Sequence, residues 1–343
     1  NFSNYYWMDY IKINEIKEII CNSESLSNIY FHNPLYRYFL TAYFTLFGHG
    51  SFALKITDFW AIFFVSIVLI KIIINTNLHN NYTLIIILLY LTNNFAGPYR
   101  YLIGRGKEEF SSLFCIFLVI YIFLYTAKNK INFSVALLFS VIALFLRLDF
   151  IFLIFSLVFF SFENYGKNLR DIYNKIFNHN LKLILLFITI VTSSLFLLIL
   201  RSYFITGFLY PIHPSQFLLA TNSQGISFDI IIKWINHLNY VFSAGIGFSH
   251  SFKFPSLFLV IGSIFLLLLF FQRRKYAFLN LPYSLSIVMV AIVLSFIFFQ
   301  TTAYPPRSSI HILPFSLIGF LLIFNILNKL IPRSKYLSKD RKT

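Results

Sequence analysis

Charged residues are scarce in this chain of 343 amino acids, and their scarcity excludes an ordinary soluble domain. Asp, Glu, Lys and Arg make up 12% of the sequence and hydrophobic residues 58%, whereas charged residues make up about a quarter of typical soluble domains. The mean hydropathy is +0.74. We therefore expect an all-α, polytopic membrane protein.

Cysteine is almost absent. Cys21 lies in a polar segment and Cys115 in an apolar run, and two cysteines are too few for a disulfide framework or a metal cluster. Three of the eight histidines, His213, His237 and His250, are too irregularly spaced for a zinc site. The sequence accordingly predicts no cofactor and supports no metal site.

Acidic residues are also few, since 12 of them oppose 28 Lys and Arg residues and leave a net charge of +16. Such a charge can indicate nucleic-acid binding. In this chain, however, the basic residues lie in short loops between apolar runs, where the positive-inside rule of membrane proteins accounts for them. We therefore expect the lipid bilayer as a partner and no nucleic acid.

Apolar runs recur along the chain and predict about nine transmembrane helices. Several runs are shorter than the roughly 20 residues that cross a bilayer, so their ends are approximate. With no internal repeat and no separate soluble domain, residues 1–343 are expected to form one transmembrane domain. The runs lie at 54–75, 82–96, 109–126, 131–147, 149–162, 182–200, 255–272, 281–300 and 309–330.

The basic residues predict the orientation of the chain. With residues 1–50 outside, the inside connections hold 16 basic and 3 acidic residues, which leaves 12 basic and 9 acidic residues outside. The N-terminus is then outside and the C-terminus inside. The loops at 1–50, 97–109, 201–254 and 301–308 share the outer face.

The first 50 residues are polar enough to lie outside the bilayer, and two amphipathic helices are expected there, parallel to the membrane surface, at 9–21 and 35–47. The second follows His32-Asn33-Pro34-Leu35-Tyr36 and ends in Leu46-Phe47-Gly48. Ala53-Leu54-Lys55-Ile56 then leads into the first apolar run.

These motifs resemble the first large outer loop of the GT-C membrane glycosyltransferases, in the bacterial branch similar to protein O-mannosyltransferases and lipid A aminoarabinose transferases. The usual form is His-Pro-Pro-Leu-Tyr; this chain has Asn33 in place of the first proline, while Pro34 still fixes the turn. The resemblance implies a GT-C-like fold that begins with a further transmembrane helix. Since no apolar segment precedes the polar stretch, we expect that the chain lacks that helix.

The resemblance also implies a function. A member of this family moves a sugar from a polyprenyl-phosphate donor to a lipid, glycan or protein acceptor on the extracytoplasmic face of the bacterial inner (plasma) membrane. Asp9, about twenty residues before the histidine motif, occupies the place of the family's catalytic aspartate. The alternative is that Asp9 only caps the helix that starts at Tyr10.

The leaving lipid phosphate needs cations, and the outer loops contain several. Arg100, Arg105 and Lys107 lie in a loop where Gly104 and Gly106 let backbone N–H groups approach an oxyanion. These residues could equally be interfacial anchors. Arg307 follows Pro305-Pro306, as an arginine does late in the family, with snorkelling to the membrane surface as its alternative.

The remaining candidates are substrate contacts. His32 and Tyr36 belong to the family motif, and Glu108 and Glu109 match an acidic position at the start of a helix, where acids are also favoured without any function. His32 can otherwise cap the turn. Arg147 and Asp149 resemble a family turn, and we expect an ion pair between them to hold a hairpin.

Two other functions are compatible with the composition. A transporter or flippase of lipid-linked glycans would place its coupling charges near the membrane midplane, whereas the charges here fall in loops. A polymerase or ligase of surface glycans would carry arginines in its largest outer loop, and here that loop contains only Arg201, Lys233 and Lys253. The donor sugar and the acceptor are not specified by the sequence.

The predicted orientation can be tested with single-cysteine variants in a background lacking Cys21 and Cys115. Ser27→Cys, Ser202→Cys and Ser308→Cys should react with an impermeant thiol reagent added outside, whereas Ser334→Cys should react only after the membrane is opened. Labelling of Ser334→Cys in sealed vesicles at the rate of the other three would contradict the orientation.

Overall fold

The computed structural model describes residues 34–48, 51–75, 80–104, 108–126, 130–147, 151–157, 181–206, 257–271, 284–299 and 305–330, with single positions between 232 and 242. All regular secondary structure in this part of the chain is helical, so the all-α prediction is confirmed. The helices are α4 (Pro34–Phe47), α5 (Ser51–Ile74), α6 (Asn80–Phe95), η1 (Arg100–Leu102), α7 (Glu109–Tyr125), α8 (Lys130–Leu146), α9 (Ile151–Leu157), α11 (Leu181–Thr206), α14 (Leu257–Phe271), α15 (Ser284–Phe299) and α16 (Pro305–Leu330).

Every predicted apolar run contains one of these helices, but their number as membrane spans is not confirmed. Two stretches, Leu54–Ile74 of α5 and Leu181–Arg201 of α11, are long and apolar enough to cross a bilayer. Both are rich in Ile, Leu and Phe and contain neither Gly nor Pro, so nothing interrupts the helix. These two helices support association with a membrane.

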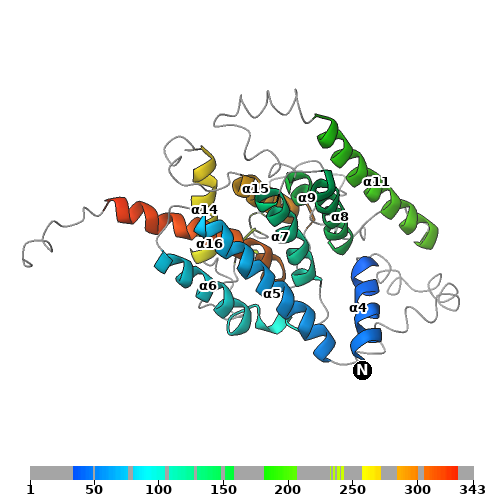
Figure 1. Cartoon of the computed structure of the whole chain (residues 1–343), viewed down its shortest axis with the longest axis horizontal. Helices are drawn as coiled ribbons and strands as arrows, with labels where there is room; N and C mark the ends of the chain where they lie inside the picture. Colours follow the sequence, from blue (N-terminus) through cyan, green and yellow to red (C-terminus); the bar gives the residue numbers. More distant parts are fainter. Residues whose placement is uncertain are drawn as a thin grey trace, which may run out of the picture.

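The predicted helix at 35–47 is confirmed as α4. Pro34 occupies its first position, where the missing N–H costs nothing. The helix ends at Phe47 because Gly48 adopts a φ of +79° and donates its N–H to the Phe44 carbonyl at 3.0 Å. α4 packs against α5 and α8 (Figure 1). The helix predicted at 9–21 lies outside the described residues.

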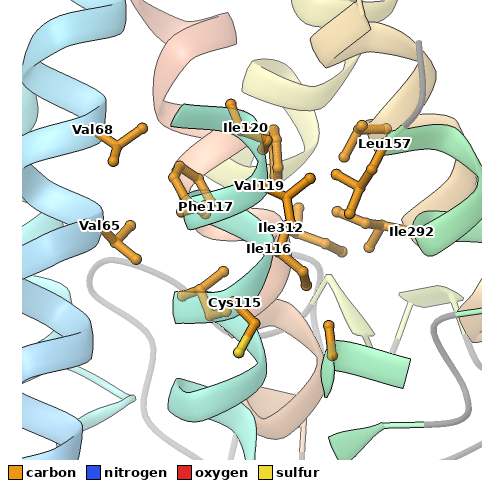
Figure 2. Packing of buried hydrophobic residues seen from close by; sticks show 14 of the residues in the cluster. Val65, Val68, Cys115, Ile116, Phe117, Val119, Ile120, Leu157, Ile292 and Ile312 are labelled. Atoms are coloured by element: carbon orange, nitrogen blue, oxygen red, sulfur yellow. The ribbon is translucent and has the colours of Figure 1, made fainter. Parts of the chain in front are cut away.

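Helix α7 forms the centre of the bundle. It contacts α5, α8, α9 and α16, and it is apolar on all sides because partners surround it. Figure 2 shows this packing: Phe117 and Val119 of α7 lie among Val68 of α5, Leu157 of α9 and Ile292 of α15. All five side chains are fully buried.

Helices α14 and α16 approach each other closely through small residues. A Cβ on Gly262 of α14 would collide with the backbone of Ser316, and a Cβ on Gly319 of α16 would collide with the backbone of Gly262. The hydroxyls of Ser263 and Ser316 lie 2.9 Å apart at the same crossing. Small residues that let two backbones meet, with a hydrogen bond between them, are typical of helix pairs in membranes.

Several buried hydroxyls in the bundle are satisfied by their own helices. Ser66, Ser140, Ser194 and Ser295 each donate to the carbonyl four residues earlier, at 2.7–2.8 Å. Such bonds let a serine lie in an apolar layer without another helix as partner. The polar groups that bond between helices are therefore the ones that fix how the helices are placed against one another.

The α14–α16 crossing can be tested by adding bulk. Gly262→Leu should lower the free energy of unfolding by about 1–3 kcal/mol, because the new side chain meets backbone that cannot yield, and this outweighs the better helix propensity of Leu. The measurement is thermal unfolding in detergent. Val290→Leu on the exposed face of α15 is the control. A Gly262→Leu protein as stable as the control would contradict the close approach.

Candidate functional site

Three charged side chains are buried near one end of the bundle. Asp58 of α5 is 2% exposed, Glu109 of α7 is 0% exposed, and Arg147, just after α8, is 3% exposed. In surroundings of aliphatic and aromatic residues, charges stay buried only if they are paired or hydrogen-bonded. The contacts of these three side chains therefore show which elements are held together at this end of the bundle.

Glu109 and Arg147 form an ion pair, with 3.7 Å between Oε1 and Nη1. Glu109 is the first residue of α7, and Arg147 follows the last residue of α8. An acid at a helix N-terminus and a base at a helix C-terminus each complement the helix dipole. The pair thus holds the two ends together where α7 and α8 meet.

Asp58 binds the chain between α6 and α7. The Gly104 N–H donates to Asp58 Oδ2 at 2.8 Å. Gly104 has a φ of +73°, and a Cβ there would lie 2.6 Å from Lys55 Cγ. The backbone conformation favours glycine at this position, and any other residue would also have to displace the Lys55 side chain.

Residues 96–104, which we call the Arg100 loop, are also anchored at Tyr99. The Tyr99 N–H donates to the Asn93 carbonyl at 3.3 Å, and its hydroxyl donates to Ser309 Oγ of α16 at 3.1 Å. Burial raises the pKa of Tyr99 far above its usual value, so the phenol stays protonated and remains a donor. Arg100 itself is exposed.

A second polar contact joins α7 to α16. Ser112 Oγ lies 2.8 Å from Nε2 of His311, and both residues are fully buried. Ser112 Oγ also lies 3.0 Å from the Glu109 carbonyl oxygen. The Ser112 hydroxyl has one proton, which it gives either to the Glu109 carbonyl, with His311 Nε2 as donor to Ser112, or to His311 Nε2.

An apolar cavity of about 200 Å³ lies next to the charged residues, between α4, α5, α7 and α8. Thr57 and Leu146, which immediately precede Asp58 and Arg147, belong to its wall. The cavity can hold an apolar group of small size. Its walls are Tyr36, Phe39, Tyr43, Thr57, Trp60, Ala61, Ser111, Phe114, Cys115, Phe139, Ile142 and Leu146.

The structure places some of the predicted site residues and not others. Glu109 lies at the centre of the charged group, Glu108 is the N-cap residue of α7, and Tyr36 is buried in the cavity wall. Arg100 lies in the Arg100 loop, and Glu109 is the first residue of the helix that follows it, α7. Asp9, His32, Arg105 and Lys107 lie outside the described residues, and Arg307 lies in the first turn of α16 with no description of its side chain.

The expected ion pair between Arg147 and Asp149 stays a prediction, because Asp149 lies outside the described residues. The structure adds a buried partner for Arg147, which is Glu109 on another helix. Asp58 and His311 were not predicted as site residues. Their signal was an ionisable residue inside an apolar run, which is costly in a membrane and commonly functional.

Among the residues that the structure describes, no group of three or more His, Cys, Asp or Glu side chains is arranged to hold a metal ion. The chain matches no known protein-family model, no curated protein and no solved structure. The chemistry of the site therefore has to be argued from its own residues. They offer a paired carboxylate, a buried hydrogen-bonded carboxylate, an exposed arginine and an apolar cavity.

The ion pair can be tested by a double-mutant cycle. Arg147→Met should cost about 3–5 kcal/mol of unfolding free energy, because it leaves Glu109 buried without its cation. Glu109→Gln added to Arg147→Met should recover most of that loss, as the uncompensated charge disappears. Thermal unfolding in detergent measures both. Additive losses in the double variant would mean that the two side chains are not coupled.

Proposed function

We propose that the chain is an integral-membrane glycosyltransferase that moves a sugar from a polyprenyl-phosphate donor to an acceptor outside the membrane. Asp9 acts as the base or orienting group for the acceptor. Arg100, Arg105, Lys107 and Arg307 bind the phosphate that leaves with the lipid. The proposal includes a GT-C-like arrangement of helices and a multi-pass location in the bacterial plasma membrane.

The observation that carries the proposal is the fixed position of the Arg100 loop at one end of the bundle. Bonds from Gly104 to Asp58 of α5 and from Tyr99 to Ser309 of α16 hold the loop, and Arg100 is exposed on it. A phosphate that stays with a membrane lipid has to be bound at headgroup level by exposed cations. An arginine on a rigid loop suits this role, because little conformational entropy is lost on binding.

Contacts of Lys71 near the other end of α5 support the proposal that this helix spans the membrane. Lys71 donates to the Tyr121 hydroxyl at 2.8 Å and lies 4.6 Å from the centre of that ring and 5.8 Å from the ring of Tyr125. Lysine and tyrosine together are typical of a membrane interface. Lys55 and Lys71 are separated by 16 residues, or about 24 Å along a helix, and their long side chains can reach the two surfaces of an apolar core of roughly 30 Å.

The cavity beside the charged residues supports a lipid-linked substrate. It is lined largely by aromatic and aliphatic side chains, and Phe39 and Trp60 on its rim are also exposed on the outside of the bundle. A donor with a phosphate head and a hydrocarbon tail needs exposed cations for the head and an apolar surface for the tail, close to each other. A soluble nucleotide-sugar donor would need no apolar surface of this kind.

A transporter of lipid-linked glycans is the second candidate, and one observation favours it. Asp58 is buried inside a helix that can span a membrane, and ionisable residues at such positions commonly belong to transport pathways. The two candidates differ in their products. A transferase releases polyprenyl phosphate and a glycosylated acceptor, whereas a transporter moves the intact lipid-linked sugar across the membrane.

The mechanism predicts different effects for the acid and for the cations. In membranes supplied with radiolabelled polyprenyl-phosphate sugars, Asp9→Asn should reduce sugar transfer about 10²- to 10⁴-fold while donor binding stays nearly intact, because the change removes the charge and keeps the shape. Full activity of Asp9→Asn would exclude Asp9 as the base.

The cation variants Arg100→Ala, Arg105→Ala and Arg307→Ala should weaken donor binding as well as the rate, because a phosphate contact is made in the ground state and strengthens as the lipid leaves. Lys253→Ala, another basic residue predicted outside, is the matched control and should bind donor normally. Unchanged donor affinity in all three arginine variants would contradict the phosphate site.

A further inference from the structure

The carboxylate of Asp58 has no part in the chemistry proposed above, yet the fold keeps it buried. Its neighbours Phe59 and Trp60 are 45% and 62% exposed, whereas Asp58 is 2% exposed and faces the bundle. Burying a carboxylate in such surroundings is costly unless hydrogen bonds compensate for it. The bond from the Gly104 N–H, at 2.8 Å, links it to the end of the Arg100 loop.

Gly104 fits against α5 through two side chains. Lys55 and Asp58 are three residues apart and therefore share one face of the helix. The hydrocarbon stem of Lys55 passes over Gly104, where a Cβ would lie 2.6 Å from its Cγ, while the Asp58 carboxylate accepts the Gly104 N–H. With a φ of +73° at Gly104, the chain turns at this point of contact.

The loop is fixed at both ends around Arg100. Tyr99 is fully buried and bonded to Ser309 and to the Asn93 carbonyl. Leu102 is buried at 2% exposure, and Gly104 is held by Asp58. Between these anchors, Arg100 begins the short helix η1 with an exposed side chain. Its direction is thus determined by the contacts on either side.

We propose that Asp58 is a positioning residue, whose bond to Gly104 fixes the Arg100 loop so that Arg100 is held ready to bind the phosphate of a membrane lipid. The inference rests on the proposed function for the identity of the ligand. Without the bond between Asp58 and Gly104, one end of the loop can move. Phosphate binding then has to restrict the motion of the loop, and this lost entropy weakens the contact with Arg100.

Hydrogen–deuterium exchange of the full chain in lipid nanodiscs, without ligand, tests the positioning directly. In Asp58→Ala, the backbone amides of residues 99–104 should exchange on the order of tenfold faster, as expected when a buried hydrogen bond that anchors the loop is lost. Asp58→Asn keeps an acceptor oxygen in place and should restore most of the protection.

Ser66→Ala is the matched control. Ser66 is a buried polar residue of the same helix, but its hydroxyl donates to the Ile62 carbonyl within α5 and not to the Arg100 loop. It should leave exchange in the loop unchanged. Unchanged exchange in Asp58→Ala, or an Asp58→Asn protein as open as Asp58→Ala, would overturn the inference.

A second variant changes the loop residue of this contact and leaves α5 unaltered, so that the inference can be tested even if Asp58→Ala does not fold. Gly104→Ala keeps the carboxylate but places a methyl group against Lys55 on backbone that disfavours it. It should open the loop as Asp58→Ala does. Protection equal to that of the unaltered protein would mean that the contact is not required.

Binding of polyprenyl monophosphate to the same nanodiscs gives the functional readout. Asp58→Ala and Arg100→Ala should each weaken binding about tenfold, and the double variant little more than either one, because Asp58 acts through Arg100. Additive losses would overturn the positioning role. If Arg100→Ala binds normally, Arg100 does not belong to the proposed phosphate site, whereas unaltered exchange in Asp58→Ala contradicts this inference alone.

Discussion

The burial of charge in an apolar bundle is the constraint on which this structure depends. Glu109 and Arg147 are almost completely inaccessible, and each is stable there only with the other nearby. Because they lie at the joined ends of α7 and α8, the requirement fixes the relative position of two helices. Asp58 imposes a similar requirement on α5 and the Arg100 loop. Three helices and a loop are thereby fixed at one end of the bundle by groups that would be costly to separate.

The helices were largely predictable, because an apolar run long enough to form a helix is visible in the sequence itself. The prediction at 54–75 differs from α5 by a few residues, and the run at 149–162 contains only the seven described residues of α9. What could not be predicted is how the helices cross. The approach of α14 to α16 depends on Gly262 and Gly319, which lie 57 residues apart. Nothing in the sequence around either glycine indicates that the two come into contact.

The site was less predictable than the fold, for the same reason. The Arg100 loop was recognisable from its glycines and cations, and Gly104 does have the unusual backbone that a glycine permits. The partner of Gly104 was not recognisable, because Asp58 lies 46 residues earlier in an apolar run. Asp149 was recognisable as a nearby acid for Arg147, whereas the ion pair of Arg147 with Glu109, 38 residues away on a different helix, was not. Local sequence indicates which residues cost free energy when they are buried, but only the fold decides which of them come into contact.

The surroundings of Asp58 bear on the choice between a transferase and a transporter. A coupling carboxylate in a transporter has to exchange ions or protons with water during each cycle, which requires a path to it and an alternative position for its partners. Asp58 instead accepts a bond from a backbone N–H of a loop that is anchored again at Tyr99. Freeing the carboxylate would require the Arg100 loop to detach from α5 and leave a polar N–H without its acceptor. A buried group bound in this way suits a permanent support, and this arrangement therefore favours the transferase.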